Sequence, residues 1–215
     1  MSAAVAPAPP PAPTTPMTRR EFLYYIWIAS MALITAETTG AIIWFAIPRF
    51  RTGEFGGVFH LDLSAIPGED SGPKEFADGR FWLVRLGQQS VADPRQPEDY
   101  PARPGVTALY KVCVHLGCLY KWVPTNDRFE CPCHGSKYLA NGVRIDGPAR
   151  RNLDALVIEI LDKDGTVLGT TKTGNADSDD TVGAPLELPA TAASIRVDTG
   201  RRVQGALNYR PGGGR

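Results

Sequence analysis

The sequence of 215 residues contains little cysteine or histidine and has no excess of charge of either sign. Its 23 basic residues balance 23 acidic ones, so no overall electrostatic field favours nucleic acid or an acidic partner. No long basic run occurs outside the termini, which also argues against a nucleic-acid partner. Four cysteines in this length are too few for a disulfide-dense secreted scaffold. Overall composition therefore indicates no particular function, and we expect the function to depend on a local site.

Proline, glycine and one cluster of metal-binding residue types are present instead. The 19 prolines and 22 glycines predict many turns, which favours a loop-rich β architecture over a helical bundle. All four cysteines and two of the three histidines lie in two short segments, Cys113–Cys118 and Cys131–Tyr138. Thiolate and imidazole are the ligands that bind soft and borderline metals. This clustering predicts a metal site, and the third histidine, His60, is interpreted as structural or exposed.

The N-terminal part predicts a tail followed by a membrane anchor. Residues 1–17 are rich in alanine and proline and carry no charged side chain, which predicts a disordered tail. Residues 18–48 predict a transmembrane helix, because Thr18 and Glu21 have capping-box spacing and the apolar run from Phe22 to Ile47 is about 39 Å long as a helix. Aromatic residues lie toward both ends, as is typical at membrane interfaces: Tyr24, Tyr25, Trp27 and Trp44.

Two arginines precede this apolar run. The pattern Arg19-Arg20-x-Phe22-Leu23 resembles a twin-arginine export signal, here retained as an anchor. The alternative is a pair of arginines that flanks the helix under the positive-inside rule. The export interpretation is preferred because that pathway carries folded proteins, and a metal cluster would have to be inserted before crossing. A cleaved signal peptide is disfavoured, since the apolar run is long and no clean A-x-A site ends it.

The remaining chain divides into three parts. Residues 49–57 contain three glycines and predict a flexible hinge or a simple linker. Residues 58–170 predict an all-β domain, and residues 171–215 a C-terminal extension that is partly loop. Residues 87–106 are polar and proline-rich, which predicts a surface loop. Strands are expected at Val58–Leu63, Phe81–Leu86, Thr107–Val112, a Leu156–Leu161 and Thr166–Gly169 hairpin, and a returning strand at Ser194–Val203.

Two kinds of metal site are consistent with the cysteine and histidine spacing. Cys-x-His in the first segment and Cys-x-x-His in the second could supply two thiolates and two imidazoles to tetrahedral zinc. That interpretation leaves Cys118 and Cys133 unexplained, and its Cys-x-His spacing is unusually tight for zinc. A two-iron two-sulfur cluster, with two cysteines on one iron and two histidines on the other, would use both segments symmetrically.

The segments C-V-H-L-G-C and C-P-C-H-G-S-K-Y resemble those of Rieske iron–sulfur proteins. They are most similar to the Rieske subunits of cytochrome bc and cytochrome bf complexes. The resemblance implies an antiparallel all-β Rieske-type domain with a cluster-binding subdomain, attached to one N-terminal transmembrane helix. It also implies the residue roles. Cys113 and Cys131 would bind the inner iron of a [2Fe-2S] cluster, His115 and His134 the outer iron, and Cys118 and Cys133 would form a disulfide.

The same resemblance implies roles for the residues around the cluster. Ser136 would donate a hydrogen bond to a bridging sulfide and Tyr138 to the Cys113 sulfur, and both bonds would raise the cluster potential. Leu116 would shield the cluster, and Gly147 and Pro148 would begin a covering loop. Arg150 stands where the family often has a second proline, and it adds a positive charge near the expected docking surface.

The function implied is that of a subunit of a quinol–cytochrome c or plastocyanin oxidoreductase. The exposed histidine His134, with His115, would meet quinol, and one electron would pass to a c-type or f-type cytochrome. The implied partners are a cytochrome b-type membrane subunit, that cytochrome, and quinol. The implied location is a cell or thylakoid membrane, with the N-terminus cytoplasmic and the Rieske domain on the outer side. The alternative is the small Rieske subunit of a periplasmic molybdenum oxidase such as arsenite oxidase.

Overall fold

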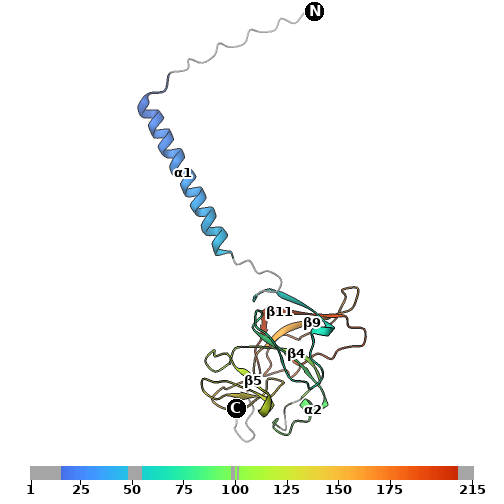
Figure 1. Ribbon diagram of the computed structural model, residues 1–215. Coiled ribbons are helices and arrows are strands. Elements are labelled where there is room, and N and C mark those ends of the chain that lie inside the picture. The colour runs from blue at the N-terminus through green and yellow to red at the C-terminus, as the bar shows by residue number, and fades with distance from the viewer. Residues whose placement is uncertain (1–15, 48–54, 98–99, 101, 208–215) are drawn as a thin grey trace, which may run out of the picture. The chain divides into compact units, whose positions relative to one another are not determined.

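The computed structural model describes residues 16–47, 55–97, 100 and 102–207 (Figure 1). The chain forms two compact units, Met1–Arg49 and Phe50–Arg215. The predicted disordered tail lies outside the described residues except for its last two positions, and most of the predicted hinge lies outside them too.

The first unit contains the helix α1, Arg19–Ala46. Its N-terminus has the predicted capping box: the Thr18 side chain accepts from the backbone N–H of Glu21, and the Glu21 carboxylate accepts from the Thr18 N–H at 2.9 Å. Among the described residues, α1 is the helix that is long and apolar enough to cross a membrane. The predicted transmembrane segment is therefore present as a helix with nearly the predicted bounds.

The second unit is built from two antiparallel sheets (Figure 1). The larger sheet has the strand order β1-β11-β9-β4-β3-β2, with β10 paired to β9, and the smaller has the order β5-β6-β7-β8. Its strands are β1 Val58–Asp62, β2 Lys74–Phe76, β3 Phe81–Leu86, β4 Gly105–Tyr110, β5 Lys121–Val123, β6 Arg128–Glu130, β7 Lys137–Tyr138, β8 Arg144–Asp146, β9 Ala155–Leu161, β10 Val167–Thr170 and β11 Ser194–Val203. The predicted fold class, an all-β domain of antiparallel sheets in a chain with one N-terminal apolar helix, is confirmed.

Several sequence patterns correspond to these strands. β3 has the predicted bounds, and β9 and β10 form the predicted hairpin, with Gly165 at φ +81° in its turn. The β4 strand begins two residues earlier than predicted, and the region expected to be only loop contains a short helix, α2 Gln88–Val91. Asp70 stabilises the start of α2, because its carboxylate accepts hydrogen bonds from the backbone N–H groups of Gly87, Gln89 and Ser90.

The C-terminal segment is part of the domain and not an appendage to it. β11 has the predicted bounds, Ser194–Val203, and pairs with β1 on one side and β9 on the other. Ile195 and Val197 of β11 are fully buried in the main core. The boundary expected at residue 170 therefore does not coincide with the edge of the folded unit.

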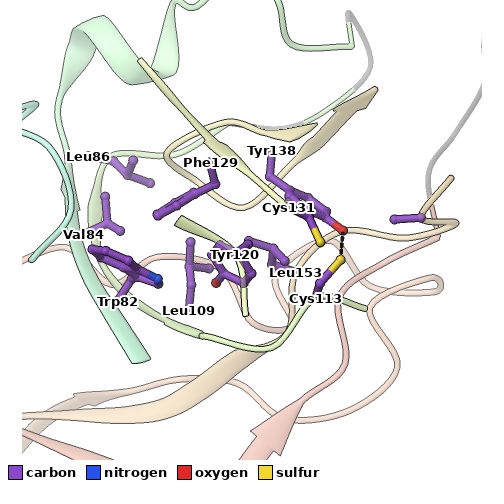
Figure 2. Packing of buried hydrophobic residues seen from close by; sticks show 11 residues of the cluster. Trp82, Val84, Leu86, Leu109, Cys113, Tyr120, Phe129, Cys131, Tyr138 and Leu153 are labelled. Atoms are coloured by element: carbon purple, nitrogen blue, oxygen red, sulfur yellow. Dashed lines mark hydrogen bonds between the residues drawn. The ribbon is translucent and has the colours of Figure 1, made fainter. Parts of the chain in front are cut away.

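Three clusters of buried hydrophobic side chains lie among the described residues of the second unit, and the two larger ones bear on the position of the site. The larger sheet covers one of them, in which Phe81, Leu83, Ile158 and Ile195 are almost completely buried. The other lies between the two sheets and joins Trp82 and Leu109 to Tyr120, Phe129 and Tyr138 (Figure 2). Cys113 and Cys131 lie at one end of this second cluster (Figure 2). The core thus holds two sulfur atoms at its boundary with the loops.

The described end of the predicted hinge is attached to the second unit. The Phe55 ring stacks on Tyr110 at a centroid distance of 5.8 Å, and the Arg80 guanidinium lies 5.0 Å from the Phe55 centroid. The Gly56 N–H donates to Thr199 Oγ1 at 2.7 Å. Residues 55–57 are therefore bound to the sheet, and the hinge prediction remains open for residues 49–54.

Candidate metal centre

Two loops with the same pattern of backbone hydrogen bonds contain the cysteines and histidines predicted to bind metal. One follows β4 and the other joins β6 to β7. In the first, the Cys113 N–H donates to the Cys118 carbonyl at 2.7 Å, and the Gly117 N–H donates to the Cys113 carbonyl at 3.0 Å. In the second, the Cys131 N–H donates to the Ser136 carbonyl at 2.9 Å, and the Gly135 N–H donates to the Cys131 carbonyl at 3.0 Å. Each loop therefore curls its backbone around its own cysteine in the same way.

A glycine with positive φ closes each curl. Gly117 has φ +83° and Gly135 has φ +76°, a conformation in which a side chain is strained. A Cβ atom at either position would meet nothing within 4 Å, so backbone conformation and not space requires glycine here.

The two loops bring together the four residues predicted to bind metal. Cys113 and Cys131 are free thiols and are buried. The rings of His115 and His134 lie 4.8 Å apart between centroids and are nearly perpendicular. Nδ1 of His115 is buried and has no hydrogen-bond partner among the described residues, as expected of a nitrogen that faces a metal. His134 is exposed.

This set of donors fits a [2Fe-2S] cluster with two thiolate and two imidazole ligands. The sulfur atoms of Cys118, Cys131 and Cys133 also lie within 4.8 Å of one another. Two of these three sulfurs are bonded to each other in a disulfide, Cys118–Cys133, so in that group only the free thiol of Cys131 is available to bind a metal. The disulfide confirms the predicted pairing and ties the first loop to the second.

Tyr138 lies against the first cysteine. Its hydroxyl oxygen is 3.2 Å from the Cys113 sulfur, and the side chain is completely buried (Figure 2). Burial, together with the hydrogen bond to Cys113, raises the pKa of Tyr138 far above its usual value, so the hydroxyl keeps its proton. The neighbouring Tyr120 is equally buried, but its hydroxyl donates to the Tyr110 carbonyl at 2.9 Å.

Ser136 is buried under the segment that begins at Gly147. Its Oγ accepts a hydrogen bond from the Ala149 N–H at 3.2 Å, which leaves its own proton free to donate elsewhere. Gly147, at φ +92°, lies so close to the second loop that a Cβ there would be 2.4 Å from Ser136 Cα. Pro148 is exposed, and Leu116 on the first loop is 69% exposed. Gly147 therefore packs against the second loop and Leu116 lies at the surface of the first, and the shielding and covering roles of these residues stay predictions.

Three charged residues that were not predicted as site residues, Arg144, Asp146 and Lys137, support this covering segment. Arg144 donates from Nη2 to the Gly147 carbonyl at 2.7 Å. Asp146 accepts from the Gly147 N–H at 2.7 Å and from Lys137 Nζ at 2.7 Å. Arg144 and Asp146 lie at the two ends of β8, outside the cysteine and histidine segments, and the segment that contains Lys137 does not indicate its partner, so these contacts depend on the folded structure.

Comparison with known proteins identifies the class of domain. Residues 71–159 match the family model described as the Rieske [2Fe-2S] domain. This range contains both loops, the disulfide and the covering segment. The chain therefore contains a Rieske [2Fe-2S] domain. The metal centre of this family is an iron–sulfur cluster, so the zinc interpretation of the cysteine and histidine spacing is wrong.

Relatives that match most of the chain identify its family more closely. The cytochrome b6-f complex iron-sulfur subunit of Synechococcus sp. (strain JA-3-3Ab) is 34% identical over 69% of this chain and 85% of its own length. The subunit of the same name from Synechococcus sp. (strain JA-2-3B'a(2-13)) is 52% identical, again over 69% and 85%. A solved chain from a hyperthermophilic respiratory Complex III is 24% identical over 78% of this chain and 98% of its own length, with a TM-score of 0.36.

The chain belongs to the Rieske iron–sulfur subunits of cytochrome bc and bf complexes, which are electron-transfer proteins with one [2Fe-2S] cluster. The curated relatives do not favour the alternative of a molybdenum-oxidase subunit. The predicted family, cofactor and general function are confirmed.

Proposed function

We propose that this chain accepts one electron from quinol and delivers it to a c-type or f-type cytochrome, as a subunit of a quinol–cytochrome c or plastocyanin oxidoreductase. The observation that carries the proposal is the exposed His134, whose ring lies 4.8 Å from that of His115, whereas the two free thiols, Cys113 and Cys131, are buried. A redox centre whose imidazoles reach the surface can contact a small substrate directly, whereas buried thiolates cannot.

Four residues are proposed as the ligands. Cys113 and Cys131 would hold one iron and His115 and His134 the other, and the unpartnered Nδ1 of His115 supports this assignment. When bound, the cluster supplies a one-electron acceptor whose potential is raised because neutral imidazoles replace two anionic thiolates. The remaining residues would stabilise the cluster, shield it from water and orient its ligands.

Two ligands are proposed to act on the substrate. The ring nitrogen of His134 that does not face the metal would accept a hydrogen bond from the quinol hydroxyl. As the electron leaves quinol, the same nitrogen would take the proton, since a metal-bound imidazole can lose or gain a proton at that position. Leu116 offers an exposed apolar surface beside the histidines and would keep water from this contact.

Two hydroxyl groups are proposed to tune the potential. Tyr138 would donate to the Cys113 thiolate and Ser136 to a bridging sulfide, supported by the 3.2 Å contact of Tyr138 and the complete burial of both side chains. Hydrogen bonds to the sulfur atoms favour the more negative, reduced state. Gly147 and Pro148 would cover the cluster and hold Ser136 in place.

The membrane arrangement is proposed from α1 and the family. α1 would anchor the chain beside a cytochrome b-type subunit, with the N-terminus cytoplasmic and the Rieske domain on the outer side of a cell or thylakoid membrane. Residues 49–54 would form the joint that lets the domain reach its acceptor. Phe55 would mark the end of the joint, because its ring is held between Tyr110 and Arg80.

Quinol titration of the purified complex tests this function. The oxidised cluster gives no electron paramagnetic resonance signal, and added quinol should produce the signal of the reduced cluster, with one spin per chain. A cytochrome should then be reduced. Dithionite gives the total amount of cluster in the same sample. A cluster that dithionite reduces and quinol does not would contradict the proposal.

A further inference from the structure

Arg144 is hydrogen-bonded to the covering segment, which begins at Gly147. This residue begins β8, and its Nη2 donates to the carbonyl oxygen of Gly147 at 2.7 Å. Its backbone N–H donates to Oδ1 of Asn152 at 2.9 Å, so Arg144 contacts both ends of the segment Gly147–Asn152. Its side chain therefore fixes the position of the carbonyl group that immediately precedes the exposed Pro148 in the chain.

The other side of the same glycine is fixed by Asp146. Oδ1 of Asp146 accepts from the Gly147 N–H at 2.7 Å, and Oδ2 accepts from Lys137 Nζ at 2.7 Å. Both polar groups of Gly147 are thus bound by side chains of β8, and Lys137 follows Ser136 in the chain. This arrangement makes the position of the covering segment depend on the charged side chains of Arg144 and Asp146.

The covering segment in turn orients Ser136. Gly147 packs against the Ser136 backbone without room for a Cβ, and the Ala149 N–H donates to Ser136 Oγ at 3.2 Å. Because a hydroxyl that accepts from one direction directs its own proton toward another, the Ala149 N–H selects which way Ser136 can donate. Moving the segment by a few tenths of an ångström would weaken that selection, since hydrogen-bond strength depends steeply on geometry.

We propose that Arg144 is a positioning residue that raises the potential of the [2Fe-2S] cluster by clamping Gly147, and thereby Ala149 and the Ser136 hydroxyl, in the donating arrangement. The inference rests on the proposed role of Ser136. It differs from a simple effect of positive charge, which would act through space and would not require Ser136 at all.

A double-mutant cycle separates these two mechanisms. Midpoint potentials are measured by electron paramagnetic resonance in membranes that hold the intact complex, for Arg144→Gln, Ser136→Ala and the combined variant. The clamp predicts that Arg144→Gln lowers the potential by less than Ser136→Ala does, and that it causes no further shift when Ser136 is already alanine. Arg144→Lys keeps a charged donor and should give a potential between those of wild type and Arg144→Gln.

Arg150→Gln is the matched control, because it removes the same charge from an exposed side chain of the same segment. The proposal requires a larger shift for Arg144→Gln than for Arg150→Gln. Hydrogen exchange of the peptide that contains Ala149 gives a second readout, and exchange should be faster in Arg144→Gln than in Arg150→Gln.

The outcomes distinguish this inference from the role proposed for Ser136. A lowered potential in Ser136→Ala with a wild-type potential in Arg144→Gln overturns the clamp alone. A shift in Arg144→Gln that persists in the Ser136→Ala background also overturns it, in favour of a direct charge effect. A wild-type potential in Ser136→Ala overturns the hydrogen-bond role of Ser136, and the clamp with it.

Discussion

The phenolic oxygen of Tyr138 lies 3.2 Å from the sulfur of Cys113, inside the cluster of buried side chains between the two sheets. Both side chains are almost completely shielded from water. In such surroundings a hydrogen bond to an anionic sulfur is stronger than at the surface, because little solvent competes with it. The contact therefore links the hydrophobic core to the redox properties of the site.

Replacing Tyr138 by phenylalanine should lower the midpoint potential of the cluster while leaving the cluster assembled. The change removes one donor to the Cys113 thiolate, so the reduced state loses more stabilisation than the oxidised state. Loss of the hydrogen bond should also reduce the free energy of unfolding by about 1 kcal/mol. A redox titration followed by electron paramagnetic resonance measures the first effect.

Tyr120→Phe provides the control for this variant. Tyr120 is buried in the same cluster, but its hydroxyl donates to the carbonyl of Tyr110. The control should lose comparable stability and keep the wild-type potential. Equal potentials in Tyr138→Phe and wild type would refute the hydrogen-bond role.

Gly147→Ala should displace the covering segment and shorten the lifetime of the cluster. The new Cβ would lie 2.4 Å from Ser136 Cα and 2.8 Å from the Gly135 carbonyl oxygen, both backbone atoms that cannot rotate away. Gly165→Ala is the control, because Gly165 has a similar positive φ, +81°, and its Cβ would meet nothing within 4 Å. The decay of visible absorbance under a chelator measures cluster loss. Equal decay rates in the two variants would show that the close approach of Gly147 is unimportant.

Replacing both Cys118 and Cys133 by serine should destabilise the loops while leaving all four proposed ligands in place. The disulfide closes a sequence separation of 15 residues, and bonds of that span contribute about 3 kcal/mol. We expect faster loss of the cluster on warming, together with a lower unfolding temperature. The two changes should be measured on the same sample, by absorbance and calorimetry. A double variant with the wild-type cluster lifetime would contradict the tethering role.

Gly53→Pro should slow electron delivery to the cytochrome and leave quinol reduction of the cluster intact. Proline restricts φ and so stiffens the proposed joint. Gly56 is a poorer test position, because its N–H donates to Thr199 Oγ1 at 2.7 Å and proline would remove that hydrogen bond. Flash-induced or stopped-flow kinetics separate the two steps. An unchanged rate of cytochrome reduction, with normal cluster content, would show that motion at this position is not required.

The sequence predicted much of the site because its information is local. Cys113, His115, Cys131 and His134 lie within two short motifs, and each motif folds around its own cysteine. The Asp164-Gly165 turn and the capping box at Thr18 are local in the same sense. Patterns of this kind determine structure over a few residues, and they were found with nearly correct bounds.

Features that depend on distant contacts were harder to predict. The placement of β11 between β1 and β9 depends on pairing between distant parts of the chain, because residues 58–62 pair with residues 194–198, and periodicity does not reveal such pairing. The stacking of Phe55 on Tyr110 and the bond from Arg144 to Gly147 depend on the assembled sheets. Phe55, Tyr110 and Arg144 belong to no motif, so only the structure could assign them a contact.

The pH dependence of the cluster potential in native membranes tests the central claim most directly. Ligation by His115 and His134, with electron transfer from quinol, predicts a reduced signal with a midpoint between roughly −150 and +300 mV. It also predicts that the midpoint falls as pH rises into the alkaline range, because the oxidised state favours loss of an imidazole proton. A midpoint near about −400 mV that does not vary with pH would indicate four thiolate ligands and would contradict this account.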